Sequence, residues 1–506
     1  MLMTIMLFFS VVSGFYAAGG EEVAAVAEVQ LAREENTCYV ICVSEDATVS
    51  EQEAARELKF WLNRMTGADF ALGPDSAEQT IYVGNSVAFR TGFPEKATRS
   101  RGHDGIYLAA SADGRDIFLT GGDPRGTLYA VATFLEDYCG IHWWTATETH
   151  VPYAPDLTVR RPDLDYVPPL EFRSLFYYGY ITSGIPEQVR FRVRNKMNGH
   201  GEVIPPELGG HLRILGLAHT FEQMLPYREY GAEHPEWFSL VDGKRIGGQQ
   251  EGQLCLTNPE VRDALLAKSL EWLTKNPDCR IISISQNDNS NGCECPSCKA
   301  LDTAEGAPAG TLLAFINPIA EAIGRQYPEV KVLTLAYLHT EEPPATLRPA
   351  SNVLIQLCPI TTRRTCPFTD PANCKFMERL KGWSAIAPNL FIWNYNCQFS
   401  DYLCFVPNYF FLGEDLRLLM HHGAKGIFAQ GNYQLPVGDF DELKGWVIAK
   451  MLWNPELDNR ELVKEFAEGY YGAAAPWILK ILERLSLNAE NNELGASLEE
   501  VIALDE

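Results

Sequence analysis

Between residues 331 and 432 the sequence contains four short apolar runs, each of which ends in polar or aromatic side chains. They read KVLTLAY (331–337), NVLIQLC (352–358), LFIWNYN (390–396) and KGIFAQGN (425–432). Helical patterns at 374–386 and 413–422 separate the last three runs. Apolar runs that alternate with amphipathic helices are typical of parallel strands covered by helices.

Four runs of the same kind precede this region, and they read EFRSLFYY (171–178), NKMNGH (195–200), RILGLAH (213–219) and RIISISQND (280–288). Further helical patterns occupy 259–274, 309–327 and 442–453. Eight strands alternating with helices predict an α/β fold, a (β/α)8 TIM barrel over residues 170–455. A doubly wound sheet is the alternative, but no Gly-rich nucleotide fingerprint follows any of the strands.

The residues before the barrel predict a small α+β domain over 37–165. Strand patterns occur at 37–43, 80–84, 105–110 and 116–122. Ser50 followed by Glu53 has the pattern of a capping box, which predicts a helix from Ser50 to Gly67. A second helix is predicted at 127–140. The Pro-rich stretch 152–169 predicts a linker, and residues 456–506 predict a C-terminal helical segment.

The chain begins with an apolar run over residues 2–12, followed by small residues at 17–20. This shape predicts a signal peptide at 1–20, and therefore a secreted or periplasmic bacterial protein. No later run is long enough to predict a membrane span. With 66 acidic and 42 basic residues the net charge is −24, which disfavours nucleic acid. A glycan or glycoprotein substrate fits this charge better.

Three of the 13 cysteines lie within six residues, in the segment NGCECPSCKA: Cys293, Cys295 and Cys298. Zinc usually takes four ligands, and the fourth could come from Cys279, Cys255 or a histidine. The alternatives are a local disulfide or buried free thiols. Because CxCxxC lacks the paired spacing of a closed zinc site, no metal ligand is assigned and no cofactor is predicted.

Catalytic residues of a barrel lie at the carboxyl ends of its strands. Here those ends are rich in aromatic and amide side chains, which suit the CH faces and the hydroxyls of sugars. The predicted substrate-binding residues are Asn198, His219, Gln286, Tyr337, Trp393, Tyr395, Gln430 and Asn432. No serine-hydrolase elbow lies in the barrel and no HExxH occurs, so esterase and zincin activities lack support.

Asp288 is the first candidate for a catalytic acid, because it follows a buried strand among other polar side chains, whereas an Asx-turn is its structural alternative. Glu341, after the fifth strand, is the second candidate, and a solvated loop position is its alternative. Glu202 is the third. His219 could contact substrate or only close the rim of the barrel.

The helix EAARELKFWLNRMTG and the segment GGDPRGTLYAVATFLEDYCGIHWW resemble the N-terminal domain of α-glucuronidases and β-hexosaminidases. The segments HPEWFSLVDGKR, SISQNDNSNGCECPSCKALD and GIFAQGNYQ resemble the bacterial family of domain of unknown function 4838, part of which is placed in glycoside hydrolase family 163. The resemblance implies a retaining endo-β-N-acetylglucosaminidase that cuts the core of complex N-glycans with help from the acetamido group of the substrate. The matching positions are Gln286, Asn287 and Asp288, and the family often has an acid where this chain has Ala429.

These observations combine into one hypothesis, a glycoside hydrolase acting on β-linked N-acetylglucosamine. In it Asp288 is the general acid/base, Asn287 orients the acetamido group, and Tyr337, Trp393 and Tyr395 shape the subsite. A rival is an α-glucuronidase-like exo-glycosidase, for which Arg363 and Arg364 are the cations near a strand end. Another rival is a catalytically silent glycan-binding protein, which Ala429 supports.

Overall fold

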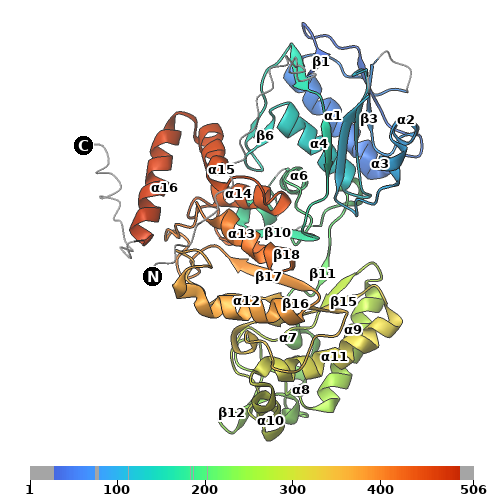
Figure 1. Cartoon of the computed structure of the whole chain (residues 1–506). Helices are drawn as coiled ribbons and strands as arrows, with labels where there is room; N and C mark the ends of the chain where they lie inside the picture. Colours follow the sequence, from blue (N-terminus) through green and yellow to red (C-terminus); the bar gives the residue numbers. More distant parts are fainter. Residues whose placement is uncertain are drawn as a thin grey trace, which may run out of the picture.

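The computed structural model describes residues 28–74, 79–111, 113–182, 184–185, 187–201 and 203–490. The predicted signal peptide at 1–20, Glu202 and the last residues of the predicted C-terminal segment lie outside this part of the chain. Figure 1 shows a smaller N-terminal unit packed against a larger α/β unit, with two further helices after the larger unit. Among the described residues, no helix has the length and apolar character needed to cross a membrane.

The N-terminal unit is built on a mixed five-stranded sheet in the order β2-β3-β5-β4-β9. The strands are β2 (Tyr39–Cys42), β3 (Gln79–Val83), β4 (Ile106–Ala110), β5 (Ile117–Gly121) and β9 (Asp163–Tyr166). Helices α1 (Val49–Thr66) and α4 (Gly126–Thr133) cover one face of the sheet, and α2 (Val87–Gly92) and α3 (Pro94–Thr98) cover the other (Figure 1). A π-helical turn, Phe134–Tyr138, follows α4.

Two predictions in this unit were wrong. Helix α1 begins two residues early, because Thr48 and not Ser50 is the N-cap and its capping-box partner is Glu51. The expected linker at 152–169 is ordered as strands. Strand β8 (Leu157–Arg160) pairs with β1 (Glu28–Ala32), and β9 completes the five-stranded sheet, so both join the N-terminal unit.

The larger unit is a curled, parallel seven-stranded sheet in the order β10-β18-β17-β16-β15-β14-β11. The strands are β10 (Phe172–Phe176), β11 (Ile214–Leu215), β14 (Ile281–Ser283), β15 (Lys331–Ala336), β16 (Val353–Leu357), β17 (Leu390–Tyr395) and β18 (Ala424–Gln430). Its larger helices are α9 (Pro259–Lys275), α11 (Pro308–Gln326), α12 (Cys374–Ile386), α13 (Leu412–His421) and α14 (Asp441–Trp453). Helices α15 (Asn459–Phe466) and α16 (Ala475–Glu490) follow.

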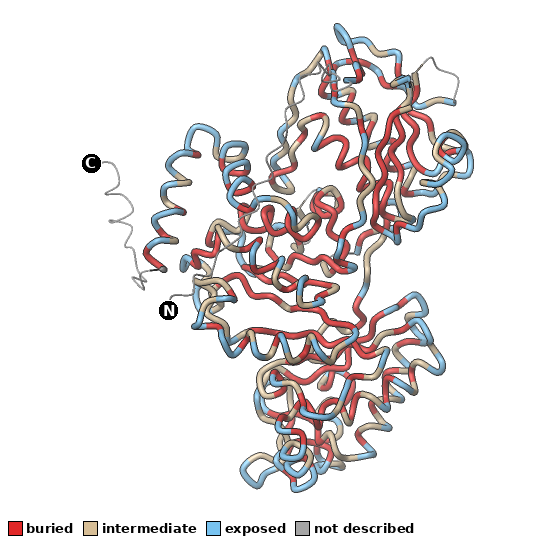
Figure 2. Tube along the Cα trace, viewed as in Figure 1, coloured by how far each residue is buried: buried red, intermediate tan, exposed pale blue. Residues whose placement is uncertain are grey.

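Side chains alternate between the two faces of these strands, as the pleat requires. Phe172, Leu333, Leu354, Phe391 and Phe428 pack together inside the curl of the sheet. Their sequence neighbours, such as Ile427 and Ala429, pack outward in the core beneath the helices. Figure 2 shows the strands of both sheets as buried, with exposure on the outer turns of the helices. The core of the larger unit is therefore the filled interior of a barrel-like sheet.

The second predicted strand, residues 195–200, is not a strand among the described residues. Lys196 has a positive φ of 59°, and the side chain of Asn198 accepts a hydrogen bond from the backbone N–H of Arg173, at 2.9 Å. The backbone N–H of Leu212 donates to the carbonyl of Asn198. The segment thus fills the gap between β10 and β11 without forming a regular ladder, because a few backbone hydrogen bonds and the side chain of Asn198 connect it to Arg173 and Leu212.

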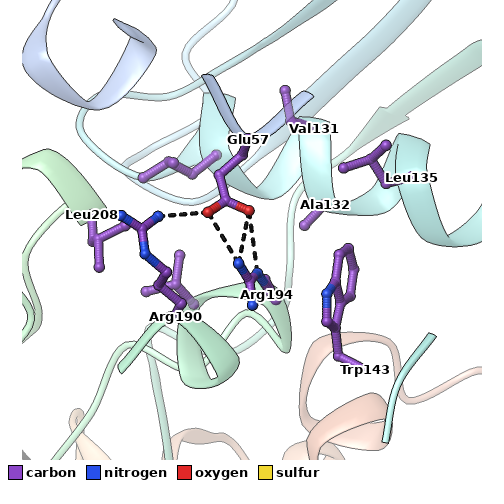
Figure 3. A pocket seen from close by; sticks show the side chains of 10 residues that line it. Glu57, Val131, Ala132, Leu135, Trp143, Arg190, Arg194 and Leu208 are labelled. Carbon is purple, nitrogen blue, oxygen red and sulfur yellow. Dashed lines mark hydrogen bonds and ion pairs between the residues drawn. The ribbon is translucent and has the colours of Figure 1, made fainter. Parts of the chain in front are cut away.

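The two units meet through ion pairs that are mostly buried. Glu57 on α1 contacts Arg194 of α6 (Gln188–Arg194) through both carboxylate oxygens, at 3.0 Å, and also contacts Arg190 (Figure 3). The carboxylate of Glu136, in the N-terminal unit, bonds to Lys196 at 2.8 Å and to Lys450. Burial favours the neutral acid, but the two lysines lower the pKa of Glu136 to about 2.

Candidate active site

A cavity of about 360 Å³ opens at the carboxyl end of the seven-stranded sheet. Aromatic rings form most of its wall, and the lining residues are Phe176, His219, Asp288, Leu335, Tyr337, Cys358, Ile360, Trp393, Tyr395, Phe399, Gln430 and Tyr433. They come from the ends of β10, β15, β16, β17 and β18 and from the segments after β11, β14 and β17. This is the end of a barrel-like sheet at which active sites form.

Asp288 is the only carboxylate among these described lining residues. Its side chain is 41% exposed, so a ligand in the cavity can reach it. The hydroxyl of Tyr337 donates a hydrogen bond to Oδ1 of Asp288, at 3.0 Å. Burial, and then the nearby charge of Asp288, raises the pKa of Tyr337 well above its usual range. Tyr337 therefore stays protonated and remains a hydrogen-bond donor to the carboxylate.

His219 is the second polar group beside Asp288. Its Nε2 atom lies 3.9 Å from Oδ1 of Asp288, and its Nδ1 atom lies 2.8 Å from the backbone carbonyl of Gln286. A carbonyl only accepts, so Nδ1 carries the proton and Nε2 faces the carboxylate. His219 has a left-handed backbone, with φ of 56°, at the start of α7 (Thr220–Met224), and this turn aims its ring at the cavity.

Trp393 and Gln430 form a fixed polar pair on the neighbouring strands β17 and β18. The indole Nε1–H of Trp393 donates to Oε1 of Gln430 at 2.6 Å. This bond sets the orientation of the amide, so that its NH2 group is the free end. The rings of Trp393 and Tyr395 lie 6.3 Å apart at an angle of 25°. They offer nearly parallel apolar faces, with a fixed amide donor beside them.

Six of the predicted site residues are brought together in this cavity: His219, Asp288, Tyr337, Trp393, Tyr395 and Gln430. Phe176, Cys358, Phe399 and Tyr433 also line it and were not among the predicted residues. Tyr433 follows the last strand closely, so strand-end position was a usable signal for it. Phe399 lies farther along a loop, where nothing in the sequence indicates which way its ring points.

Asn287 does not line the cavity, and the prediction that it orients the substrate is not supported. Its side-chain carbonyl accepts from the backbone N–H of Glu222 at 3.0 Å, and its NH2 group donates to the carbonyl of Gly252 at 2.9 Å. The side chain is buried and saturated with backbone partners. Its neighbour Gln286 is likewise buried, and its NH2 group donates to the carbonyl of Leu335 and to Thr340.

Glu341 is also placed away from the cavity wall, so its assignment as a second catalytic acid is not supported. It is buried and pairs with Arg379 at 2.7 Å. Burial raises the pKa of Glu341, and Arg379 only partly offsets this effect. The indole N–H of Trp383 donates to the backbone carbonyl of Glu341 at 2.8 Å. These contacts give the residue a role in packing the loop after β15 against α12.

Two predicted amides serve the fold and not the cavity. Asn198 is buried, and its NH2 group donates to Asp104 and to the carbonyl of Glu171. Asn432 is buried too, and it bonds to the carbonyls of Leu435 and Val437 and to Asp441. Both amides are occupied by neighbouring segments, which leaves them no free group for a substrate.

Ala429 points away from the cavity. Its neighbours Phe428 and Gln430 face the inside of the sheet, whereas Ala429 packs in the outer core. Side chains alternate along a strand, so an acid at this position would lie beneath the helices. The presence of alanine therefore removes no carboxylate from the cavity.

The fold resembles that of glycoside hydrolases. A family 115 4-O-methyl-α-glucuronidase specific for decorated arabinogalactans superposes with a TM-score of 0.57 at 12% identity, covering 90% of this chain and 62% of that one. A family 138 enzyme that targets pectin rhamnogalacturonan II gives 0.52 at 12% identity, covering 89% and 68%. A family 89 enzyme from Clostridium perfringens, in complex with 2-acetamido-1,2-dideoxynojirimycin, gives 0.50 at 12% identity, covering 88% and 53%.

The chain itself belongs to the family of domain of unknown function 4838, which it matches over residues 143–483. The matched region contains the whole seven-stranded sheet and every residue that lines the cavity. No curated protein sequence matches the chain. The chain spans less than two thirds of the family 115 and family 89 enzymes, so parts of those proteins have no counterpart here.

Proposed function

We propose that this protein is a glycoside hydrolase that cleaves glycans containing β-linked N-acetylglucosamine. The observation that carries the proposal is Asp288, the only carboxylate among the described residues that line a cavity walled by aromatic rings. Most glycosidases place two carboxyl groups on either side of the scissile bond. One carboxylate in the described lining of the cavity suits the variant in which the 2-acetamido group of the substrate is the nucleophile.

Asp288 acts in both steps of this mechanism. First the acetamido oxygen attacks the anomeric carbon, the glycosidic bond breaks, and the leaving oxygen takes the proton of Asp288. Then the carboxylate of Asp288 accepts a proton from water, whose oxygen attacks the anomeric carbon and reopens the oxazoline ring. The product keeps the anomeric configuration of the substrate. The hydroxyl of Tyr337 holds the carboxylate of Asp288 by its hydrogen bond to Oδ1, and Nε2 of His219 lies 3.9 Å from the same oxygen.

Gln430, and not Asn287, is the amide that binds the sugar. The side-chain oxygen of Gln430 accepts a hydrogen bond from the indole N–H of Trp393, so its NH2 group donates to a hydroxyl or to the acetamido carbonyl of the sugar. Trp393 and Tyr395 supply flat apolar faces against the CH face of the ring. The family 89 enzyme in complex with a 2-acetamido sugar analogue supports an acetamido group in a cavity of this fold.

Within this activity we favour an endo-acting enzyme on N-glycans, as the resemblance to glycoside hydrolase family 163 implies. Two matched substrates test the mechanism, 4-methylumbelliferyl β-chitobioside and its analogue with a 2-hydroxyl in place of each acetamido group. We expect hydrolysis of the first only, and inhibition by N-acetylglucosamine-thiazoline, which mimics the oxazoline. Equal rates on both substrates would rule out acetamido participation.

Arg364 supports a second candidate, an α-glucuronidase-like enzyme. Its guanidinium lies 5.8 Å from the ring centre of Tyr395 and 5.6 Å from that of Phe399, and both rings line the cavity. In the described part of the chain no carboxylate pairs with Arg364. The carboxylate of a uronate substrate would be the ion-pair partner of Arg364. Release of glucuronic acid from an aryl α-glucuronide by the wild type, lost in Arg364→Gln, would establish this activity in place of the first.

A further inference from the structure

Four cysteine side chains gather beside the loop that carries Asp288, outside the cavity. Their sulfur atoms all lie within 4.8 Å of one another, and they belong to Cys255, Cys293, Cys295 and Cys298. We call this set the four-cysteine cluster. One member comes from the segment before α9, and the other three come from the loop after β14 and the first turn of α10 (Pro296–Glu305). Three of the four are buried and Cys293 is half-buried.

The sulfur atoms are too far apart for disulfide bonds. The sulfurs of Cys255 and Cys295 lie 3.7 Å apart, whereas a disulfide bond is about 2.05 Å long. All 13 cysteines of the chain are free thiols. The four cysteines form a group of their own, separate from the large hydrophobic cores, and Leu240 packs against them.

We propose that the four-cysteine cluster binds one structural zinc ion. Zinc takes four thiolates in a tetrahedron with bonds of about 2.3 Å, which places neighbouring sulfurs about 3.8 Å apart. The distance of 3.7 Å between the sulfurs of Cys255 and Cys295, and the upper limit of 4.8 Å on all sulfur–sulfur distances in the cluster, match a tetrahedron of this size. Calcium and magnesium prefer oxygen ligands, so a set of four sulfurs favours a soft ion. Four protein ligands also close the coordination shell, which is typical of a structural site and not of a catalytic one.

The surroundings of the cluster suit thiolates. The backbone N–H of Leu240 donates to the sulfur of Cys293 at 3.4 Å, and the guanidinium of Arg245 lies 3.7 Å from the same sulfur. The hydroxyl of Thr257 lies 3.2 Å from the sulfur of Cys298. Binding of zinc releases the thiol protons to solvent and leaves two negative charges on the site. Arg245 and these donors offset that charge.

The cluster joins the two segments that position Asp288. Gln253, two residues before Cys255, accepts from the backbone N–H of Asn287 at 2.8 Å and donates to its carbonyl at 3.0 Å. The NH2 group of Gln253 also donates to the carbonyl of Asn289, at 2.9 Å. Asp288 lies between these two clamped residues. Zinc at the cluster would therefore hold the segment of Gln253 and the loop of Asp288 together. This consequence for catalysis rests on the proposed function, whereas the metal site does not.

The direct test is the metal content of the full-length protein purified without chelator. We expect about one zinc per chain by inductively coupled plasma mass spectrometry. X-ray absorption should show four sulfur neighbours at about 2.3 Å. Titration with 4-hydroxymercuribenzoate should release the zinc, read with 4-(2-pyridylazo)resorcinol. Protein without metal, or disulfides within residues 255–298 in peptide mass spectra, would overturn the proposal. Iron in place of zinc would overturn the choice of metal.

Two variants and a matched control separate zinc binding from general damage. Cys295→Ser and Cys298→Ser should each lose at least nine tenths of the zinc. Cys279→Ser should keep it, because this buried thiol lies outside the cluster and a serine hydroxyl can still donate to the carbonyl of Ile281. Full zinc content in both cluster variants would contradict the proposal. If the wild type holds zinc but cleaves no glycan, the proposed function fails and the metal site stands.

Discussion

At the scale of single residues, the strand end after β14 shows how neighbours in sequence take opposite roles. Asp288 faces the cavity and is partly exposed, whereas Gln286 and Asn287 turn inward and bond to the backbone. A buried amide without partners is costly, so these two residues stabilise the loop that Asp288 needs. The three residues of this motif therefore divide into Asp288, which faces the cavity, and Gln286 and Asn287, which hold the loop of Asp288 in place.

Asn287→Ala and Gln430→Ala test this division. Asn287→Ala leaves the N–H of Glu222 and the carbonyl of Gly252 unpaired, so we expect the free energy of unfolding to fall by about 2–3 kcal/mol. Gln430→Ala removes a group at the cavity wall and leaves one donor, the indole N–H of Trp393, without its acceptor, so we expect a higher KM and a smaller loss of stability than in Asn287→Ala. Urea unfolding and steady-state kinetics measure both variants. A stable Asn287→Ala with a raised KM would reverse the two roles.

Much of the site could be predicted, because the carboxyl ends of parallel strands meet at one edge of a sheet. That rule alone brought His219, Tyr337 and Trp393 to the same cavity. The rule does not predict whether a side chain points into the cavity or away from it once the strand has ended and a loop has begun. Asn198 and Asn432 were therefore misplaced, since their burial depends on bonds to Asp104 and Asp441, which lie far away in the sequence or on the next helix.

At the scale of secondary structure, the long helices and most strands follow from periodicity, and the exceptions have local causes. Residues 195–200 look like a strand in sequence, but a left-handed Lys196 and the Asn198 side chain replace its ladder. The start of α1 was misplaced because Ser50 and Thr48 can both begin a capping box, and only the backbone geometry selects Thr48.

Helix α13 carries a buried acid whose effect on stability can be measured. Asp415 lies in its first turn and accepts from the backbone N–H of Phe368, at 2.8 Å. Burial raises the pKa of Asp415 from 3.8 to about 8, despite that hydrogen bond. The folded protein thus holds a proton that the unfolded chain releases between about pH 4 and 8. Across this window its contribution to stability falls as pH rises, by about 1.4 kcal/mol per pH unit at most.

Asp415→Asn removes the titrating group and keeps a carbonyl oxygen for Phe368. We expect the variant to gain stability over the wild type as pH rises from 5 to 9, measured by urea unfolding at pH 5, 7 and 9. Parallel stability curves for the two proteins would show that Asp415 does not titrate in this range.

At the scale of the whole molecule, the N-terminal unit is joined to the barrel-like unit by buried ion pairs that cross between the two units. Glu136 brings its carboxylate to Lys196 and Lys450, and Asp104 pairs with Arg173 on β10. Figure 1 shows this unit against the side of the barrel-like sheet. A sequence-based prediction gives both units, but it cannot pair charges 60 residues or more apart, so the docking appears only in the structure.

Glu136→Gln should weaken this junction. It leaves two buried lysines without a carboxylate, so we expect a loss of about 3–5 kcal/mol. The control, Glu57→Gln, weakens the less buried contacts of Glu57 with Arg190 and Arg194 in the same interface and should cost less, about 1 kcal/mol. Because the folded pKa of Glu136 is lowered to about 2, its contribution is present above about pH 4.5 and is lost as pH falls toward 2. Equal losses in the two variants would contradict the assigned role of burial.

We propose that Asp288 transfers the proton in glycoside cleavage, and glycan release tests this role most directly. A glycoprotein with complex N-glycans is treated with the wild type and, separately, with Asp288→Asn. The masses of the protein and of the released glycan are then measured by mass spectrometry. We predict release that leaves one N-acetylglucosamine on each site, with a rate reduced by about 10²–10⁴-fold in the variant. Equal release by both proteins, or glycan binding without cleavage by the wild type, would contradict the account.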